Sequence, residues 1–107
     1  MVGENFVILV GKITKPNFKE LDNDNYMFKA RLAIPTNEED VQYEKFQYVK
    51  VGAWGGLAED LGILPEHTYI RIHGHIEESS YDSECRYCKS PEKKYWTEVI
   101  IDNYILV

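Results

Sequence analysis

Residues 45–54, KFQYVKVGAW, decide the fold because their side chains alternate between two kinds along the segment. Val49, Val51 and Ala53 are apolar, whereas the alternate positions carry aromatic and cationic side chains: Phe46, Tyr48, Lys50 and Trp54. Successive side chains of a β-strand point to opposite faces of a sheet. The segment therefore predicts a strand with one face in a core and the other presenting rings and a charge.

The segments on either side extend this strand into a small barrel. Gly55 and Gly56 break the strand, and residues 57–64 then carry apolar side chains at helical spacing. Further strands are predicted from β-branched and alternating apolar residues at 5–14, 26–34, 68–81 and 95–107. Five strands with one short helix between the third and fourth are the order of an OB-fold barrel. We expect an all-β protein made of a single domain over residues 1–107.

Polar segments and prolines are expected to separate these elements. Lys15, Pro16 and Asn17 predict the end of the first strand, because proline cannot donate to a β-ladder. Residues 36–44 are acidic and predict a loop, and residues 82–94 predict a polar hairpin tip. In the second strand, Met27, Lys29, Arg31 and Ala33 fall on the face opposite Tyr26, Phe28, Ala30, Leu32 and Ile34.

The composition limits what kind of nucleic-acid-binding surface the chain can have and where in the cell we expect it. The net charge is −6 with a pI of about 5.0, so any surface for nucleic acid must be a local basic groove or depend on stacking. Aromatic residues make up 13% of the chain and serve equally as strand formers or as a stacking surface. The sequence contains no apolar run of membrane length, and we expect no signal peptide because no charged start is followed by an apolar stretch and a cleavage site. With two closely spaced cysteines, a cytoplasmic location is the simplest expectation.

The sequence carries no catalytic motif. It lacks a glycine-rich phosphate loop, a His-Glu-x-x-His motif and a Gly-x-Ser-x-Gly motif, so we expect a non-enzymatic protein without a cofactor. Cys85 and Cys88 form a Cys-x-x-Cys pair, but a zinc site needs about four ligands. Because His73 and His75 lie about ten residues away, free thiols are favoured, with zinc or a disulfide as alternatives.

Four segments, in the same order, resemble the bacterial and mitochondrial single-stranded DNA-binding protein family. They are NFVILVGKI at 5–13, YVKVGAWGGLAE at 48–59, YIRIHGHI at 69–76 and WTEVII at 96–101. The resemblance covers almost the whole chain. It implies a homotetramer or homodimer that binds single-stranded DNA without sequence preference, in replication, recombination or repair. Replication proteins are further expected partners, and a membrane is not. The family's acidic-tipped tail is not expected here, because the sequence stops at Val107.

The resemblance also assigns the site. The stacking aromatics of the family's third strand fall on Tyr48 and Trp54, and the one beyond its fourth strand falls on Tyr81. A further stacking ring falls on Phe46 or Tyr43. Stacking suits a binder without sequence preference because every base has a π-face. The candidate phosphate contacts are the strand-borne cations Lys12, Lys29, Arg31, Lys50 and Arg71. Solvated charge is the alternative for each cation, and burial under the helix or at a subunit contact is the alternative for Trp54.

One segment departs from the family. Residues 77–80, EESS, occupy a stretch that is usually basic, so we expect weaker binding or a different path for the strand. Two other functions remain open. One is an OB-fold protein-interaction module of a replisome or primosome with weak or no nucleic-acid binding. The other is an OB fold that binds RNA or an oligosaccharide.

Overall fold

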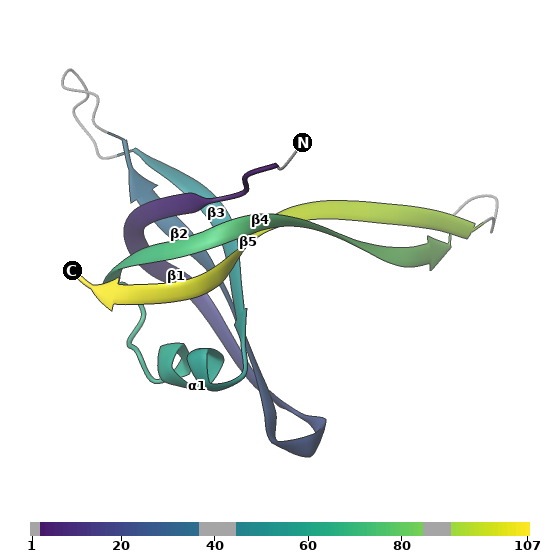
Figure 1. The fold of residues 1–107 in the computed structure, drawn as a ribbon, viewed down its shortest axis with the longest axis horizontal. Helices are drawn as coiled ribbons and strands as arrows, with labels where there is room; N and C mark the ends of the chain where they lie inside the picture. Colours follow the sequence, from purple (N-terminus) through teal and green to yellow (C-terminus); the bar gives the residue numbers. More distant parts are fainter. Residues whose placement is uncertain (1–2, 37–44, 85–90) are drawn as a thin grey trace.

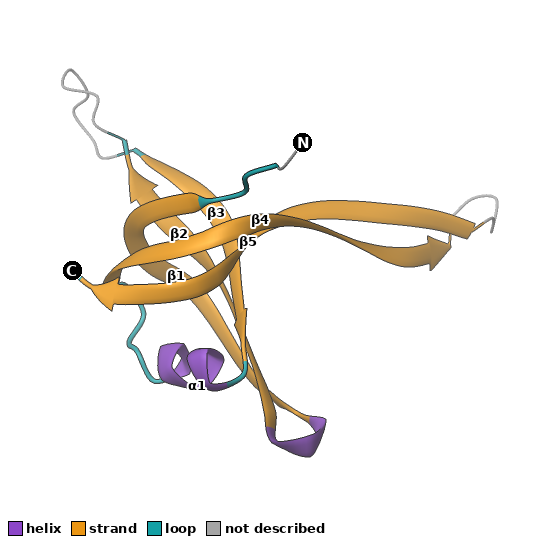
Figure 2. Ribbon diagram, in the orientation of Figure 1, coloured by secondary structure: helices purple, strands orange, loops and turns teal. Residues whose placement is uncertain are grey.

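The computed structural model describes residues 3–36, 45–84 and 91–107 (Figure 1). In chain order the elements are β1 (Val7–Leu21), the 3₁₀ helix η1 (Asp22–Asp24), β2 (Asn25–Pro35), β3 (Phe46–Trp54), α1 (Gly56–Gly62), β4 (Tyr69–Glu84) and β5 (Pro91–Leu106). The strands close into a barrel in the order β1-β2-β3-β5-β4, and α1 lies between β3 and β4 in sequence (Figure 2). The predicted all-β barrel and the position of its helix are confirmed.

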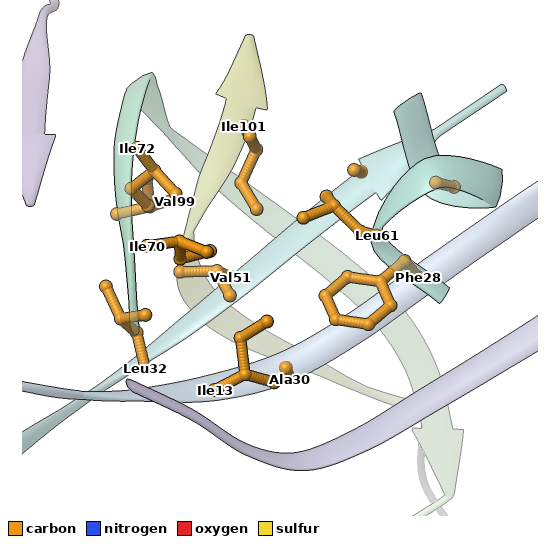
Figure 3. Close-up of a cluster of buried hydrophobic side chains, with 12 residues drawn as sticks. Ile13, Phe28, Ala30, Leu32, Val51, Leu61, Ile70, Ile72, Val99 and Ile101 are labelled. Carbon is orange, nitrogen blue, oxygen red and sulfur yellow. The ribbon is translucent and has the colours of Figure 1, made fainter. Parts of the chain in front are cut away.

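The core is built from the apolar face that each strand turns inward. Figure 3 shows Phe28 of β2 beside Leu61 of α1, so the helix closes one end of the barrel over the strands. Leu61 and Ala58 are fully buried, whereas the opposite side of the helix is exposed. The core cluster comprises Ile13, Phe28, Ala30, Leu32, Val51, Ala53, Ala58, Leu61, Ile70, Ile72, Val99 and Ile101. Within the described part of the chain, no helix is long and apolar enough to cross a membrane.

Strand β1 does not end at Pro16, so that prediction is wrong. The strand continues to Leu21, and its pairing with β2 shifts by one residue between Thr14 and Asn17. An extra residue on one strand is a β-bulge, and a bulge accommodates a residue that cannot donate to the ladder. Lys15 takes up the change in direction with a positive φ of 49°.

Strands β4 and β5 form a long hairpin that leaves the barrel as an arm (Figure 1). Their antiparallel register continues outward from Glu77↔Glu98 to Glu84↔Pro91. The predicted polar tip at 82–94 is therefore too wide, because regular pairing extends along the charged segments on both sides. Near the base of the arm the register shifts at Gly74. A Cβ on Gly74 would overlap the carbonyl oxygen of Ile100, so the close approach of the two backbones there requires glycine.

Candidate nucleic-acid interface

The outer face of β2 and β3 gathers most of the predicted site. Directly paired residues of a sheet point to the same side. Arg31 pairs with Lys50, and these two cations stand between the pairs Ala33↔Tyr48 and Met27↔Trp54. Tyr48 is 56% exposed and Trp54 is 44% exposed. The alternation predicted from the sequence is therefore present in space, with a ring toward each end of β3 and positive charge between them.

Gly52 lets the Trp54 indole and the Lys29 side chain fold over β3. A Cβ on Gly52 would lie 3.2 Å from the Lys29 Nζ and 3.4 Å from the Trp54 Cη2. The ammonium of Lys29 stands 4.4 Å from the centre of the indole, within the range of a cation–π interaction. Lys29 also donates to both carboxylate oxygens of Glu98, at 2.9 and 2.7 Å. Glu98 is buried, so Lys29 is engaged within the protein and holds one side of the Trp54 ring.

Tyr48 belongs to a second aromatic group at the other end of β3. Its ring lies 6.4 Å from that of Phe46, in a tilted arrangement. Lys12 of β1 places its ammonium 4.5 Å from the centre of the Phe46 ring. Ala33 lies on the same outer face, but it is fully buried because it is flanked by Lys12 and Tyr48 in register. The two ends of β3 therefore share one arrangement, a ring covered by a lysine.

Two grooves run along this face and share part of their lining. The central groove, of about 260 Å³, is lined by Lys15, Asn17, Lys29, Ala30, Arg31, Lys50, Val51 and Glu98. The Tyr48 groove, of about 410 Å³, is lined by Thr14, Lys15, Arg31, Tyr48, Glu66 and His67. Lys15 and Arg31 line both grooves. Although the chain is acidic, cations outnumber carboxylates along this path.

Two predicted site residues, Arg71 and Tyr81, do not lie on the outer face of β2 and β3. Arg71 pairs with Val10 and Ile105, so it stands on the β1–β4–β5 part of the surface. Tyr81 lies far out on the arm, opposite Lys94. The uncertain alternative Tyr43 lies outside the described residues, as do Cys85 and Cys88. Among the residues that the structure describes, no cluster of three or more His, Cys, Asp or Glu side chains could hold a metal ion.

His75 sits between two carboxylates near the base of the arm. Its Nδ1 lies 2.8 Å from the Asp102 Oδ2, and its Nε2 lies 2.8 Å from the Glu77 Oε2. The hydrogen bond to Asp102 is the largest cause of a raised His75 pKa, followed by the one to Glu77. Because both ring nitrogens face acceptors, the arrangement favours the imidazolium, which offsets acidic charge contributed by β4 and β5.

A closed five-stranded barrel with a helix between its third and fourth strands is an OB fold, and here it carries exposed rings and cations along β2 and β3. The chain matches the Single-strand binding protein family over residues 4–107. It therefore belongs to that family, as the sequence resemblance indicated. No curated protein sequence matches the chain.

A solved structure gives the same fold. The crystal structure of the wild-type single-stranded DNA binding protein from Thermus aquaticus superposes with a TM-score of 0.73 and 22% sequence identity. The match covers 98% of this chain and 50% of that chain, so the chain spans half the length of that protein. At this identity the likeness establishes the fold.

Sequence reasoning missed several residues that line grooves next to the predicted site, among them Lys15, Lys94 and Trp96. Lys15 was assigned to the end of a strand, although the bulge turns it into the central groove. Lys94 and Trp96 line a third groove with Lys50 and Tyr95. Alternation from the buried Val99 places Trp96 and Glu98 on the outer face, a signal that was present in the sequence.

Proposed function

We propose that this protein binds single-stranded DNA without sequence preference, by stacking bases on Tyr48 and Trp54 and by holding phosphates with cations between them. One observation carries the proposal. Two exposed rings lie six positions apart on one face of β3, which corresponds to about 20 Å of extended strand, and Arg31 and Lys50 lie between them. This spacing suits several nucleotides of an unpaired strand, whose bases are free to stack.

Family membership and charge support the same function. The chain belongs to a family described as single-strand binding. The cations of the central groove lie on an acidic protein of net charge −6, so the basic path is local. Phe46 adds a further ring near Tyr48. Binding of this kind is passive and requires no catalytic group. It serves DNA replication, recombination or repair, in which unpaired strands must be covered.

Not all the predicted phosphate contacts have the same role in this proposal. Arg31 and Lys50 are exposed and line the central groove, so they are the primary phosphate contacts. Lys12 and Lys29 stand over rings and contribute charge from these fixed positions. Arg71 reaches a strand that continues around the barrel toward β1 and β4.

We also propose that the protein works as a homo-oligomer, a dimer or a tetramer. The β1–β4–β5 part of the surface exposes apolar side chains at Ile8, Val10 and Ile105, and Phe6 is exposed just before β1, with exposed fractions of 43%, 43%, 52% and 69%. Several exposed apolar side chains on one part of a small protein are typical of an interface. Sedimentation equilibrium tests this, and a monomer at micromolar concentration would contradict it.

The test of DNA binding is a titration of a labelled oligo-dT, followed by fluorescence anisotropy. We expect Trp54→Ala to weaken binding at least about fivefold, because a base stack is worth about 1–3 kcal/mol. Trp54→Phe should retain most of the affinity. Phe18→Ala is the matched control, since Phe18 is 42% exposed but stacks on Tyr26. That variant should bind like the wild type.

The same titration separates the alternative functions. A single-strand binder loses affinity as salt rises and prefers oligo-dT to duplex DNA. An OB-fold protein-interaction module would leave the anisotropy of oligo-dT unchanged, and that result would refute the proposal. A preference for oligo-U or for an oligosaccharide over oligo-dT would move the function to RNA or sugar binding.

A further inference from the structure

The Lys29 side chain crosses β3 to reach a carboxylate on β5. Lys29 of β2 pairs with Gly52 of β3, and Gly52 pairs in turn with Ile100 of β5. Glu98 lies two positions before Ile100, on the same outer face of the sheet. The lysine donates to both oxygens of this carboxylate, at 2.9 and 2.7 Å. A Cβ at Gly52 would lie 3.2 Å from the Lys29 Nζ, so the absence of a side chain there opens the route of the lysine across β3.

The Trp54 indole lies beside the crossing lysine. Trp54 is two positions after Gly52 and is therefore on the same face of β3. The Lys29 ammonium stands over the ring, 4.4 Å from its centre, in a cation–π contact. Trp54 is still 44% exposed, so the ring keeps area that a flat ligand can cover. The protein contacts the indole through a cation and leaves part of the ring open.

Glu98 restrains that cation. A lysine ammonium sits on a flexible stem of four carbons, which by itself allows many positions over a ring. Here the ammonium donates two charge-assisted hydrogen bonds to a carboxylate that is only 5% exposed, and such bonds are stronger there than in water. Because Glu98 is buried, a ligand on the outer face does not touch it. Its effect on Trp54 passes through Lys29.

We propose that Glu98 is a positioning residue for DNA binding, which holds the Trp54 indole, through Lys29, in the orientation on which a base stacks. This inference rests on the proposed function. Ordering a mobile side chain during binding costs affinity, and a ring that is already restrained avoids that cost. A carboxylate on the binding face therefore strengthens DNA binding, whereas its repulsion of phosphates alone would weaken binding.

The first test measures the mobility of the indole in the free protein. The chain has two tryptophans, Trp54 and Trp96, so in a Trp96→Phe background the indole emission comes from Trp54 alone. Glu98→Gln removes the charge and one of the two acceptors, and it should increase the fast component of the fluorescence anisotropy decay. Glu66→Gln is the matched control, because Glu66 is a half-exposed carboxylate that lines the Tyr48 groove. It should leave the decay unchanged. An unchanged decay in Glu98→Gln would overturn the positioning role.

The second test is a double-mutant cycle on the affinity for oligo-dT. We expect Glu98→Gln to cost about threefold more affinity in the wild type than in the Trp54→Ala variant. Removal of the charge acts on the phosphates in both backgrounds, so the difference isolates what passes through the ring. Glu66→Gln removes the same charge and should change the affinity by the same factor in both backgrounds. Lys29→Arg should retain the affinity and the restrained ring, because a guanidinium pairs with a carboxylate and stacks on an indole.

The outcomes separate this inference from the function beneath it. Equal effects of Glu98→Gln with and without the Trp54 ring would refute the positioning role, and DNA binding would stand if Trp54→Ala alone weakens binding. If the wild type does not bind oligo-dT, the proposed function itself fails. Circular dichroism of each variant at the temperature of the titration shows that the fold is retained, so that a loss of affinity is not a loss of structure.

Discussion

Replacing Lys29 by methionine should cost the protein a large part of its stability, because the substitution leaves Glu98 with a buried charge. Glu98 is 5% exposed, and the Lys29 Nζ lies 2.9 and 2.7 Å from its two carboxylate oxygens. Removing one partner of a buried ion pair costs about 3–5 kcal/mol. A domain of this kind has a total stability of about 5–15 kcal/mol. We therefore expect Lys29→Met to unfold at a markedly lower urea concentration.

The reverse substitution should cost less, and this asymmetry tests the reasoning. In Glu98→Gln the lysine keeps its charge, but its side chain is 29% exposed and can turn toward water. Loss of the charged hydrogen bonds then costs about 1.5–3 kcal/mol. The double variant Lys29→Met/Glu98→Gln buries no uncompensated charge. It should be more stable than Lys29→Met alone, which gives a favourable coupling in a double-mutant cycle.

The assay is urea unfolding followed by circular dichroism, with the slope compared between variants so that the free energies share one reference. Lys19→Met serves as control, because Lys19 is an exposed residue of the β1–β2 hairpin and its substitution should change stability by about 0.5 kcal/mol or less. If Lys29→Met costs under about 1 kcal/mol, or no more than Glu98→Gln, then Glu98 is hydrated in solution and the buried pair is refuted.

Two further predictions concern the base of the arm. Because Asp102 and Glu77 raise the His75 pKa above its ordinary 6.5, the stability that the imidazolium contributes is complete below pH 6.5 and is lost as pH rises through the raised value. The His75→Gln variant should therefore have a lower free energy of unfolding than the wild type at pH 6, and the two free energies should converge toward pH 9. A difference in free energy that stays constant across this range would contradict the stabilising contacts of His75 with Asp102 and Glu77. Gly74→Ala should destabilise strongly because its Cβ meets the Ile100 carbonyl oxygen, whereas Gly56→Ala, with nothing within 4 Å, should be neutral or slightly stabilising. Equal unfolding temperatures for the two alanine variants would rule out the close approach at Gly74.

The face on which each strand residue lies could be predicted because the side-chain period of a strand is two. Alternation along 45–54 placed Tyr48, Lys50 and Trp54 together, and the register of β3 with β2 adds Arg31 to them. The same argument identified Phe28 and Leu32 as core. These predictions use local information only, since each residue is compared with the residues two positions before and after it in the sequence. The barrel and most of its outer face were accessible in this way.

The remaining features depend on partners that are distant in sequence. Lys29 and Glu98 are 69 positions apart, and β2, β3 and β5 must first assemble before the pair can form. Alternation marks both residues as outward-facing, yet it does not show that Glu98 is buried there. The continuation of β1 past Pro16 also depends on a distant partner. Pairing with β2 as far as Asn25 offsets the cost of the bulge. Pro16 is a local signal for the end of a strand, but the hydrogen-bonded ladder between β1 and β2 outweighs it.

The charges along the outer face of β2 and β3 decide how much electrostatic attraction the proposed binding can use. Glu98 is paired with Lys29, and cations outnumber carboxylates in the two grooves, so the acidic total charge does not describe this face. Lys29 in turn is committed to Glu98, which reduces the charge that it can offer to a phosphate. With about three or four effective cations, the slope of log affinity against log salt would be only about −2 to −3 for a single strand. Two or three stacked bases at about 1–3 kcal/mol each then supply the larger share of the affinity. If the proposed function holds, DNA binding therefore depends more on the aromatic rings than on the charge, which would allow an acidic chain to bind an acidic ligand.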